Sequence, residues 1–441
     1  MSEKANFRAL LPMIVFLVLF IGTGIALTAA GADMPFYQLS ATVAIIPAIV
    51  LAILQGKDDL NKKIGVFLSG VGEINIITMC MIFLLAGGFA SVASAIGGVK
   101  ATVNFGLSLL PPSMILPGLF LIGAFISTAM GTSMGTVAAI APIAVGVGEQ
   151  TDIPLALLLG VVMSGAMFGD NLSMISDTTI AATRTQGCEM KDKFRMNLLI
   201  ALPAALVTLA LLWFAGASGQ VVKHEEYQFI RVVPYLAILV MALAGVNVFI
   251  VLLAGIVFTG AVGIASVGGY TLIQWSKDIY SGFVGMNEIM VLSMLVGGLG
   301  ELMRYHGGIS WLLERVNGLA RKLSAESPVK AGECCISLLV LLANLCTANT
   351  VAIILTGKVA HEIAVSNGVD RRRSASLLDI FSCVVQGLIP YGAQLLLAGS
   401  IAKLSPLSIA GNNWYCMLLA VAAVFAILFG IPRVRPVRPL A

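Results

Sequence analysis

Charge is what this sequence has least of. Only 11% of its 441 residues are charged, whereas 59% are hydrophobic, and the mean hydropathy is +0.99. Soluble domains usually contain about 25% charged residues. The composition therefore excludes an ordinary soluble protein and predicts an all-α chain that crosses a membrane many times.

Metal-ligand and disulfide patterns are absent as well. The three histidines lie far apart, and the seven cysteines show no C-x-x-C spacing. We interpret the cysteines as small packing residues. No resident cofactor or transition metal is expected, and nucleic acid is not an expected partner. The expected partners are membrane lipid and a small cation or small-molecule substrate.

Long apolar segments predict ten membrane-crossing helices. Two further segments, 113–148 and 334–365, are apolar but rich in hydroxyls, and we expect them to form re-entrant hairpins. The first apolar run is too long for a typical signal peptide, so it is expected to stay as a helix. The ten predicted crossings lie at 9–30, 38–55, 73–96, 154–183, 196–217, 231–246, 248–268, 287–303, 374–402 and 414–431.

Basic residues are distributed unevenly over the predicted loops. With a cytoplasmic N-terminus and hairpins that do not cross, twenty Lys and Arg residues fall on the cytoplasmic side and five outside, with Lys358 inside a hairpin. This is the bias described by the positive-inside rule. We therefore expect both termini to be cytoplasmic and the protein to lie in the plasma membrane, the inner membrane of a bacterium.

The chain contains signs of an internal duplication. Residues 84–98 align with 294–308 at a spacing of 210, which places four glycines over four glycines. TVAAI from Thr136 falls near TVAII from Thr350 once four residues are inserted. An odd number of crossings per half, here five, forces the second half to be inverted. The predicted repeats are 1–217 and 218–441, and inverted repeats with interrupted helices are typical of secondary transporters.

The most informative segment runs from Leu155 to Thr183. About 15 uncharged residues precede Asp170, or roughly 22 Å of helix at ~1.5 Å per residue, so this carboxylate lies well inside a hydrocarbon layer ~30 Å thick. A charge there costs on the order of 3 kcal/mol and usually faces a water-filled path or a partner. Asp177 follows in the same segment, and GDNLSMISDTT concentrates hard oxygen ligands suited to a small cation.

Interruptions occur at matching places in the two predicted halves. The first half has STAMGTSMGT in its hairpin and GDNLSMISDTT in a broken helix; the second has NLCTANT and QGLIPYGAQ at the corresponding places. Pro390 cannot donate a helical hydrogen bond, so free carbonyls are expected around it, and helix N-termini in the same cavity would favour an anion. The possible additional site-lining residues are Thr132, Ser133, Thr136, Asn344, Thr347, Asn349, Thr350, Pro390 and Gln394.

The segment from Gly169 to Thr179 resembles the GDxxSxxSDT signature of NhaC-type sodium/proton antiporters, within the larger ion transporter superfamily. The resemblance extends over nearly the whole chain and implies an elevator-type transporter, in which hairpins and broken helices move against a scaffold that commonly dimerises. It also implies a cation site made by Asp170, Asn171, Ser173, Asp177 and Thr178. Many family members have Lys at the position of Asn171 and Pro at that of Met174, which leaves the transported solute open.

The leading hypothesis is a sodium/proton antiporter. Burial disfavours a charged carboxylate, so sodium and protons would compete for one site, and the carrier would reorient only when loaded. The second hypothesis is a sodium- or proton-coupled transporter of amino acids or organic acids on the same scaffold. The third hypothesis is an ion channel, which is disfavoured because acidic groups interrupt only one of the two halves. A membrane-embedded enzyme is the least favoured, because the aspartates have no accompanying histidine or metal-ligand set.

Asp379 follows shortly after three arginines, Arg371, Arg372 and Arg373. We expect Asp379 to pair with or face this basic group.

Overall fold

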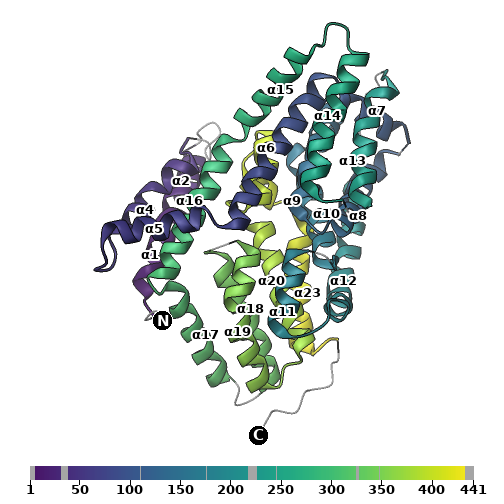
Figure 1. The fold of residues 1–441 in the computed structure, drawn as a ribbon. Coiled ribbons are helices and arrows are strands. Elements are labelled where there is room, and N and C mark those ends of the chain that lie inside the picture. The colour runs from purple at the N-terminus through teal and green to yellow at the C-terminus, as the bar shows by residue number, and fades with distance from the viewer. Residues whose placement is uncertain are drawn as a thin grey trace.

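The protein is described by a computed structural model in which every regular element of the described residues is a helix (Figure 1). The structure describes residues 5–30, 38–109, 111–174, 176–216, 226–244, 246–323, 327–346 and 348–432. The prediction of an all-helical chain is confirmed for these residues. The boundary expected between two repeats, at 217/218, falls outside them.

Apolar helices coincide with all ten predicted crossings. Seven helical segments of the described chain are long and apolar enough to cross a membrane, and shorter apolar helices account for the predicted crossings at 38–55, 231–246 and 414–431. The seven are Phe7–Leu27, Ile76–Ala95, Leu155–Gln186, Met190–Gly216, Val248–Ser266, Leu272–Tyr305 and Arg371–Ala402.

The N-terminal helices form one flank of the molecule, at the left of Figure 1. They pack against α16, and α17 packs against the first short helix. The elements are η1 (Phe7–Leu10), α1 (Leu11–Leu17), η2 (Val18–Gly22), α2 (Thr23–Ala29), α3 (Ala41–Ala44), α4 (Ile46–Leu54), α16 (Asn287–Tyr305) and α17 (Gly308–Leu323).

Two helix pairs pack across one another through glycines. The pairs are α5 (Leu60–Val71) with α6 (Ile74–Ala95), and α15 (Leu272–Gly285) with α16. Helix α5 packs on α16, whereas α15 packs on α6. A Cβ on Gly70 would lie 2.5 Å from the Gly297 carbonyl oxygen, and a Cβ on Gly87 would lie 2.5 Å from that of Gly282. Only glycine permits these backbones to approach so closely.

Of the remaining helices, α7, α13 and α14 are drawn at the upper right of Figure 1, and α12 and α23 are drawn below them. Pro203 lies inside α12, which continues past it to Gly216. These elements are α7 (Gly98–Leu109), η4 (Pro112–Met114), α12 (Met190–Gly216), η5 (Phe229–Arg231), α13 (Val233–Leu243), α14 (Val248–Ser266), α22 (Pro406–Ala410) and α23 (Trp414–Phe429).

Two helical hairpins and two broken helices form the centre. The broken-helix segments are the most enclosed apolar segments described, at 78% and 89% buried, against 28% for the N-terminal one. They pack on the hairpins and on α12 and α23. The hairpins are α8 (Ile115–Met130) with α9 (Ser133–Gln150), and α18 (Pro328–Asn344) with α19 (Asn349–Asn367); the broken helices are α10 (Leu155–Leu172) with α11 (Asp177–Gln186), and α20 (Arg371–Leu388) with α21 (Ala393–Ala402).

The helix bounds of the two halves differ by a constant spacing in this centre. Helices α10 and α20 both have 18 residues and start 216 positions apart, and α11 and α21 both have 10 residues with the same spacing. Ser133 and Asn349, the first residues of α9 and α19, are also 216 apart. A spacing of 216 is six residues more than the spacing of 210 that aligns 84–98 with 294–308. The sequence match of TVAAI to TVAII had used an insertion of only four residues.

Candidate functional site

The tip of the first hairpin is shaped by a left-handed glycine. Gly131 ends α8 with φ of 69°, a conformation that glycine adopts without strain. Thr132 then caps α9, because its side-chain oxygen accepts a hydrogen bond from the Gly135 N–H at 3.4 Å. Ser133 is the first residue of α9, so its N–H and hydroxyl point away from the helix at the tip of the hairpin.

The break between α10 and α11 places two carboxylates at facing helix ends. Helix α10 ends at Leu172, Ser173 and Ser176 have extended backbones, and α11 begins at Asp177. Ser176 caps α11 by accepting a hydrogen bond from the Thr179 N–H at 3.3 Å. Asp170 therefore lies in the last turn of α10, and Asp177 lies in the first turn of α11, where the helix dipole favours negative charge.

Asp170 is bound by the hairpin tip. Its side chain is buried, with the residue 8% exposed, and Oδ2 accepts hydrogen bonds from the Ser133 hydroxyl at 2.6 Å and from the Ser133 N–H at 3.3 Å. Charge-assisted hydrogen bonds of this kind stabilise a carboxylate more than neutral contacts do. No basic side chain of the described residues forms an ion pair with Asp170.

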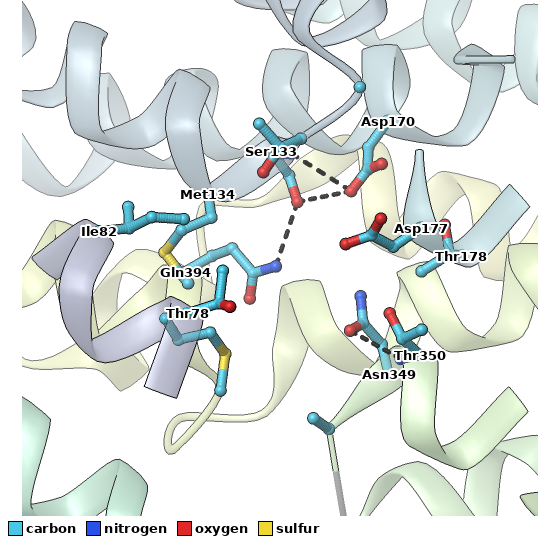
Figure 2. Close-up of a pocket in the computed structure, with 14 residues that line it drawn as sticks. Thr78, Ile82, Ser133, Met134, Asp170, Asp177, Thr178, Asn349, Thr350 and Gln394 are labelled. Atoms are coloured by element: carbon cyan, nitrogen blue, oxygen red, sulfur yellow. Dashed lines mark hydrogen bonds between the residues drawn. The ribbon is translucent and has the colours of Figure 1, made fainter. Parts of the chain in front are cut away.

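A cavity of about 90 Å³ opens beside these groups. Figure 2 shows the carboxylates of Asp170 and Asp177 directed toward the same space, with Thr178 beside them and Asn349 and Thr350 across from them. The volume suffices for a small cation with water, since one water needs about 10–15 Å³ by this measure. The lining residues are Thr78, Met79, Ile82, Gly131, Thr132, Ser133, Met134, Asp170, Asp177, Thr178, Ala348, Asn349, Thr350 and Gln394.

Four helices begin at this cavity. They are α9, α11, α19 and α21, and each contributes lining residues from its first turn or its N-cap region. Each N-terminus carries unpaired N–H groups and about half a positive charge. Helices α8 and α10 end at the same cavity, where Gly131 and Asp170 line it, so the two carboxylates lie among helix ends of both kinds.

Three of the predicted site residues lie behind the cavity wall. The Asn171 side chain accepts a hydrogen bond from Asn197 Nδ2 at 2.8 Å, Ser173 donates to the Thr128 carbonyl at 3.1 Å, and Thr136 donates to the Thr132 carbonyl at 2.9 Å. None of the three lines the cavity. Their contacts hold the broken helix and the hairpin in shape rather than reaching into the open space.

The remaining predicted residues of the second half divide in the same way. Asn349, Thr350 and Gln394 line the cavity with the aspartates. Asn344 lines a different, smaller cavity, and Pro390 lies in the break between α20 and α21. Thr347 lies outside the described residues.

An ion pair that the sequence analysis missed lies next to the broken helix. The Lys193 ammonium lies 2.7 Å from Asp379 Oδ2 and also donates to the Asn171 carbonyl and the Thr179 hydroxyl. The expectation that Asp379 pairs with or faces the arginines was wrong: Asp379 lies two turns further along α20, where α12 is the neighbouring helix. Lys193 and Asn197 are four apart on α12, a spacing that could have indicated one polar helix face.

The side of the cavity formed by α6 carried no sequence signal. Thr78, Met79 and Ile82 of α6 line it, and they stand in an ordinary apolar run. Among the residues with described positions, no group of three or more His, Cys, Asp and Glu side chains is arranged to hold a metal ion. Oxygen ligands from carboxylates, hydroxyls and amides are what the cavity offers, and these suit hard cations.

Comparison with known proteins finds similarity to membrane antiporters. Residues 4–217 match the model of the Na⁺/H⁺ antiporter family. The first part of the chain is thus similar to the Na⁺/H⁺ antiporter family, the kind of protein that its GDNLSMISDT segment resembles. Together with the apolar helices, this similarity indicates an integral membrane transporter.

The proteins to which this chain is similar are named for different solutes. It is 26% identical to a Bacillus subtilis protein named "Malate-2H(+)/Na(+)-lactate antiporter", with 95% of each chain covered. It is also 26% identical to the Na(+)/H(+) antiporter NhaC of the same organism, over 72% of this chain and 76% of that one. Among solved structures, the YdaH transporter of Alcanivorax borkumensis aligns over 97% of this chain and 99% of that chain, with 13% identity and a TM-score of 0.45.

Proposed function

We propose that this protein exchanges cytoplasmic sodium for protons at the cavity formed by Asp170 and Asp177. The observation that carries the proposal is the position of Asp170: a buried carboxylate, bound by the Ser133 hydroxyl at 2.6 Å, at the edge of a cavity of about 90 Å³. Protons and sodium both neutralise such a carboxylate, one covalently and the other through oxygen ligands.

The coupling follows from the cost of moving an empty site. Two unneutralised carboxylates inside the membrane would cost several kcal/mol to carry through it, whereas a site loaded with sodium or with protons is closer to neutral. The carrier then reorients only when it is loaded, and inward proton movement drives sodium outward. If proton and sodium numbers differ, each net charge moved is driven by ~2.3 kcal/mol per 100 mV.

We further propose that the moving part consists of the hairpins and broken helices, arranged as two inverted repeats. Near a two-fold axis, residues contact their own counterparts. The Cys383 thiol donates to the Met167 carbonyl at 3.4 Å across a spacing of 216, and the Cys80 thiol donates to the Met290 carbonyl at 3.7 Å across a spacing of 210. The reciprocal packing of α5 on α16 and of α15 on α6 supports the same symmetry.

A second set of equivalent contacts supports the repeats. Asn197 on α12 donates to the Asn171 carbonyl at 2.9 Å, and Asn413 just before α23 donates to the Gly387 carbonyl at 2.8 Å. Both donors and both acceptors are 216 positions apart. An elevator movement of this centre against α6 and α16 would expose the aspartate cavity to the two sides in turn.

The test is proton movement after a sodium pulse in proteoliposomes with an enclosed pH dye. We expect sodium-dependent proton movement for the natural sequence and none for Asp170→Asn. Asp152→Asn is the matched control, because Asp152 is an exposed aspartate in the connection that precedes α10. Exchange that persists in Asp170→Asn would remove Asp170 from the mechanism.

Exchange of an organic acid is the second candidate. The four helix N-termini around the cavity favour it, because half-helix N-termini bind substrate carboxylates in secondary transporters, and a relative covering 95% of this chain is named for malate and lactate. Counterflow of radiolabelled lactate or malate in the same proteoliposomes distinguishes the candidates. Organic-acid uptake that requires a sodium or proton gradient would establish this one.

A further inference from the structure

A larger cavity, of about 450 Å³, lies between α16 and α21. The described residues that line it are different from those of the aspartate cavity. The carboxylate of Glu288, in the first turn of α16, is among them. Glu288 lies 16 residues after Leu272 and 17 before Tyr305, the ends of a helical segment long and apolar enough to cross a membrane. This carboxylate is therefore near the middle of a candidate membrane span.

Glu288 is held there without a fixed counter-charge. The ion pairs found among the described residues do not include it, although Lys403 lines the same cavity. Its Oε1 accepts a hydrogen bond from the Ser40 hydroxyl at 2.5 Å. A carboxylate at mid-depth needs a water-filled path or a partner, and the cavity has room for water, since one water needs about 10–15 Å³ by this measure.

The helices α6 and α16 correspond to one another at a spacing of 210. Helix α6 ends at Ala95 and α16 ends at Tyr305. Gly97 and Gly307, just beyond these ends, both have left-handed backbones, with φ of 72° and 85°. Each of these pairs is 210 positions apart, so the structure confirms the register that the glycine alignment of 84–98 with 294–308 predicted.

The same register relates one wall of the aspartate cavity to one wall of the larger cavity. Three residues of α6 line the aspartate cavity, and all three of their counterparts on α16 line the larger one. These residues are Thr78, Met79 and Ile82 of α6, and Glu288, Ile289 and Leu292 of α16. The two helices therefore present equivalent walls, in which a glutamate replaces a threonine.

The central helices, in contrast, line the aspartate cavity in pairs. Eight of the described lining residues form four pairs with members 216 positions apart. The pairs are Thr132 with Ala348, Ser133 with Asn349, Met134 with Thr350, and Thr178 with Gln394. This part of the lining is symmetric about the proposed two-fold axis. The flanking helices break the symmetry, because α6 contributes to the described lining and α16 does not.

We propose that Glu288 is a third carboxylate of the transport site, which reaches the bound cation only when the central helices face α16. The proposal rests on the exchange and the inverted repeats proposed above. A lining that is paired about an axis can meet α6 in one state and α16 in the other, since these helices present equivalent walls. Exchange of the two repeats then brings Glu288 to the place that Thr78 occupies in this structure.

The two states would differ in charge. Facing α6, the cavity has two carboxylates and the Thr78 hydroxyl. Facing α16, it would gain the Glu288 carboxylate, and a charge-assisted contact to the cation replaces a neutral one. Cations should therefore bind more tightly from one side of the membrane than from the other. The equilibrium between the two empty states compensates for this difference, so the asymmetry drives no net transport by itself.

Sodium affinity measured separately from the two sides tests the third carboxylate. Right-side-out and everted membrane vesicles give the sodium concentration for half-maximal proton movement on each side. Glu288→Gln should raise this concentration about tenfold on one side and leave the other unchanged. Glu314→Gln is the matched control, because Glu314 is an exposed glutamate of α17 that lines neither cavity. An equal change on both sides, or no change on either, would overturn the proposal.

A double variant moves the carboxylate from one wall to the other. Thr78→Glu combined with Glu288→Thr keeps the net charge and places the glutamate on α6. The side with the higher sodium affinity should then be the opposite one. A preference that keeps its direction would overturn the role of Glu288, and this comparison remains decisive if Glu288→Gln alone is inactive.

Cysteine crosslinking tests the approach of α16 without requiring transport. The background is the full chain with its seven free cysteines replaced by alanine. Thr78→Cys with Gln394→Cys should be linked by mercuric ion, because both positions line the aspartate cavity. Glu288→Cys with Thr178→Cys is the same pair after exchange of the repeats, and it should be linked as well. Glu314→Cys with Thr178→Cys is the control that should not be linked.

The outcomes separate this proposal from the exchange on which it rests. A linked Thr78–Gln394 pair beside an unlinked Glu288–Thr178 pair would mean that α16 never reaches the site, and this would overturn the proposal. The exchange fails by a different result, the absence of proton movement on a sodium pulse in the natural sequence, whichever pairs are linked.

Discussion

Lys193 and Asp379 form a buried ion pair, with Nζ 2.7 Å from Oδ2, between α12 and α20. Both side chains are essentially excluded from solvent, at 0% and 2% exposed. Lys193 also donates to the carbonyl of Asn171 at the end of α10, as a cation at a helix C-terminus should. The pair thus connects three helices directly behind the aspartate cavity.

Loss of one member of this pair should destabilise the protein strongly. Lys193→Met or Asp379→Leu leaves an uncompensated buried charge, which costs about 3–5 kcal/mol. The double variant removes both charges and should recover most of the loss. Thermal unfolding in detergent measures this, and single variants that unfold like the natural sequence would contradict the buried pair.

Ser133→Ala should change the pH profile of exchange. The Ser133 hydroxyl stabilises the ionised form of Asp170, so its removal makes the proton harder to lose. Half-maximal exchange should then shift to higher pH, with a smaller effect in Ser133→Thr, which retains a hydroxyl. The measurement is the initial rate of sodium-driven proton movement between pH 6 and 9, and an unshifted Ser133→Ala profile would contradict the contact.

The glycine contacts between the two helix pairs can be tested with glycines from the same helices. Gly70→Val and Gly282→Val would drive a Cβ into the facing backbone, and overpacking of this kind costs about 1–3 kcal/mol. Gly65→Val in α5 and Gly285→Val in α15 are matched controls, because nothing lies within 4 Å of a Cβ there. Thermal unfolding should separate the two sets, and equal stabilities would mean that the helices do not pack in this way.

Asp370 provides a pH dependence outside the membrane. It caps α20 by accepting from the Arg372 N–H at 2.9 Å and binds the Arg372 guanidinium at 2.8 Å. Burial raises the pKa of Asp370, but the hydrogen bonds and charge of Arg372 outweigh it and hold the pKa below its usual 3.8. Because the folded pKa is lowered, the stabilisation is complete above about pH 4 and is lost as the pH falls further.

Asp370→Ala should therefore lose about 0.5–2 kcal/mol at pH 7, the usual effect of losing a helix cap. The difference in unfolding temperature between this variant and the natural sequence should shrink as the pH falls below about 4. Asp370→Asn, which can still cap the helix, should lose less at pH 7. A difference that stays constant down to pH 3 would contradict the role of the ionised carboxylate.

The fold was predictable from the sequence to the level of helices and hairpins. All ten predicted crossings coincide with apolar helices, and 113–148 and 334–365 coincide with helical hairpins. Long apolar runs must be helical in lipid, because no water satisfies the backbone there. The crossed packing of α5 on α16 and α15 on α6 was not predictable, since glycines in a sequence do not identify the backbone that approaches them.

The candidate site was predictable only in part. Asp170, Asp177 and Thr178 line the cavity, because a broken helix turns its free ends inward. Asn171 and Ser173 belong to the same motif, yet their side chains bond to α12 and α8. Which residues of a polar motif face a cavity depends on how the helix on each side of the break is rotated about its own axis. The motif itself does not specify that rotation.

The sequence by itself determined that the chain is helical, is apolar enough to lie in a membrane and has two aspartates in one long apolar segment, because hydropathy acts locally along the chain. Only the tertiary structure decided what surrounds those aspartates. Lys193 pairs with Asp379 across a separation of 186 positions, and Gln394 reaches Ser133 across 261. Contacts between residues so distant in sequence are set by how whole helices pack, and no local pattern encodes them.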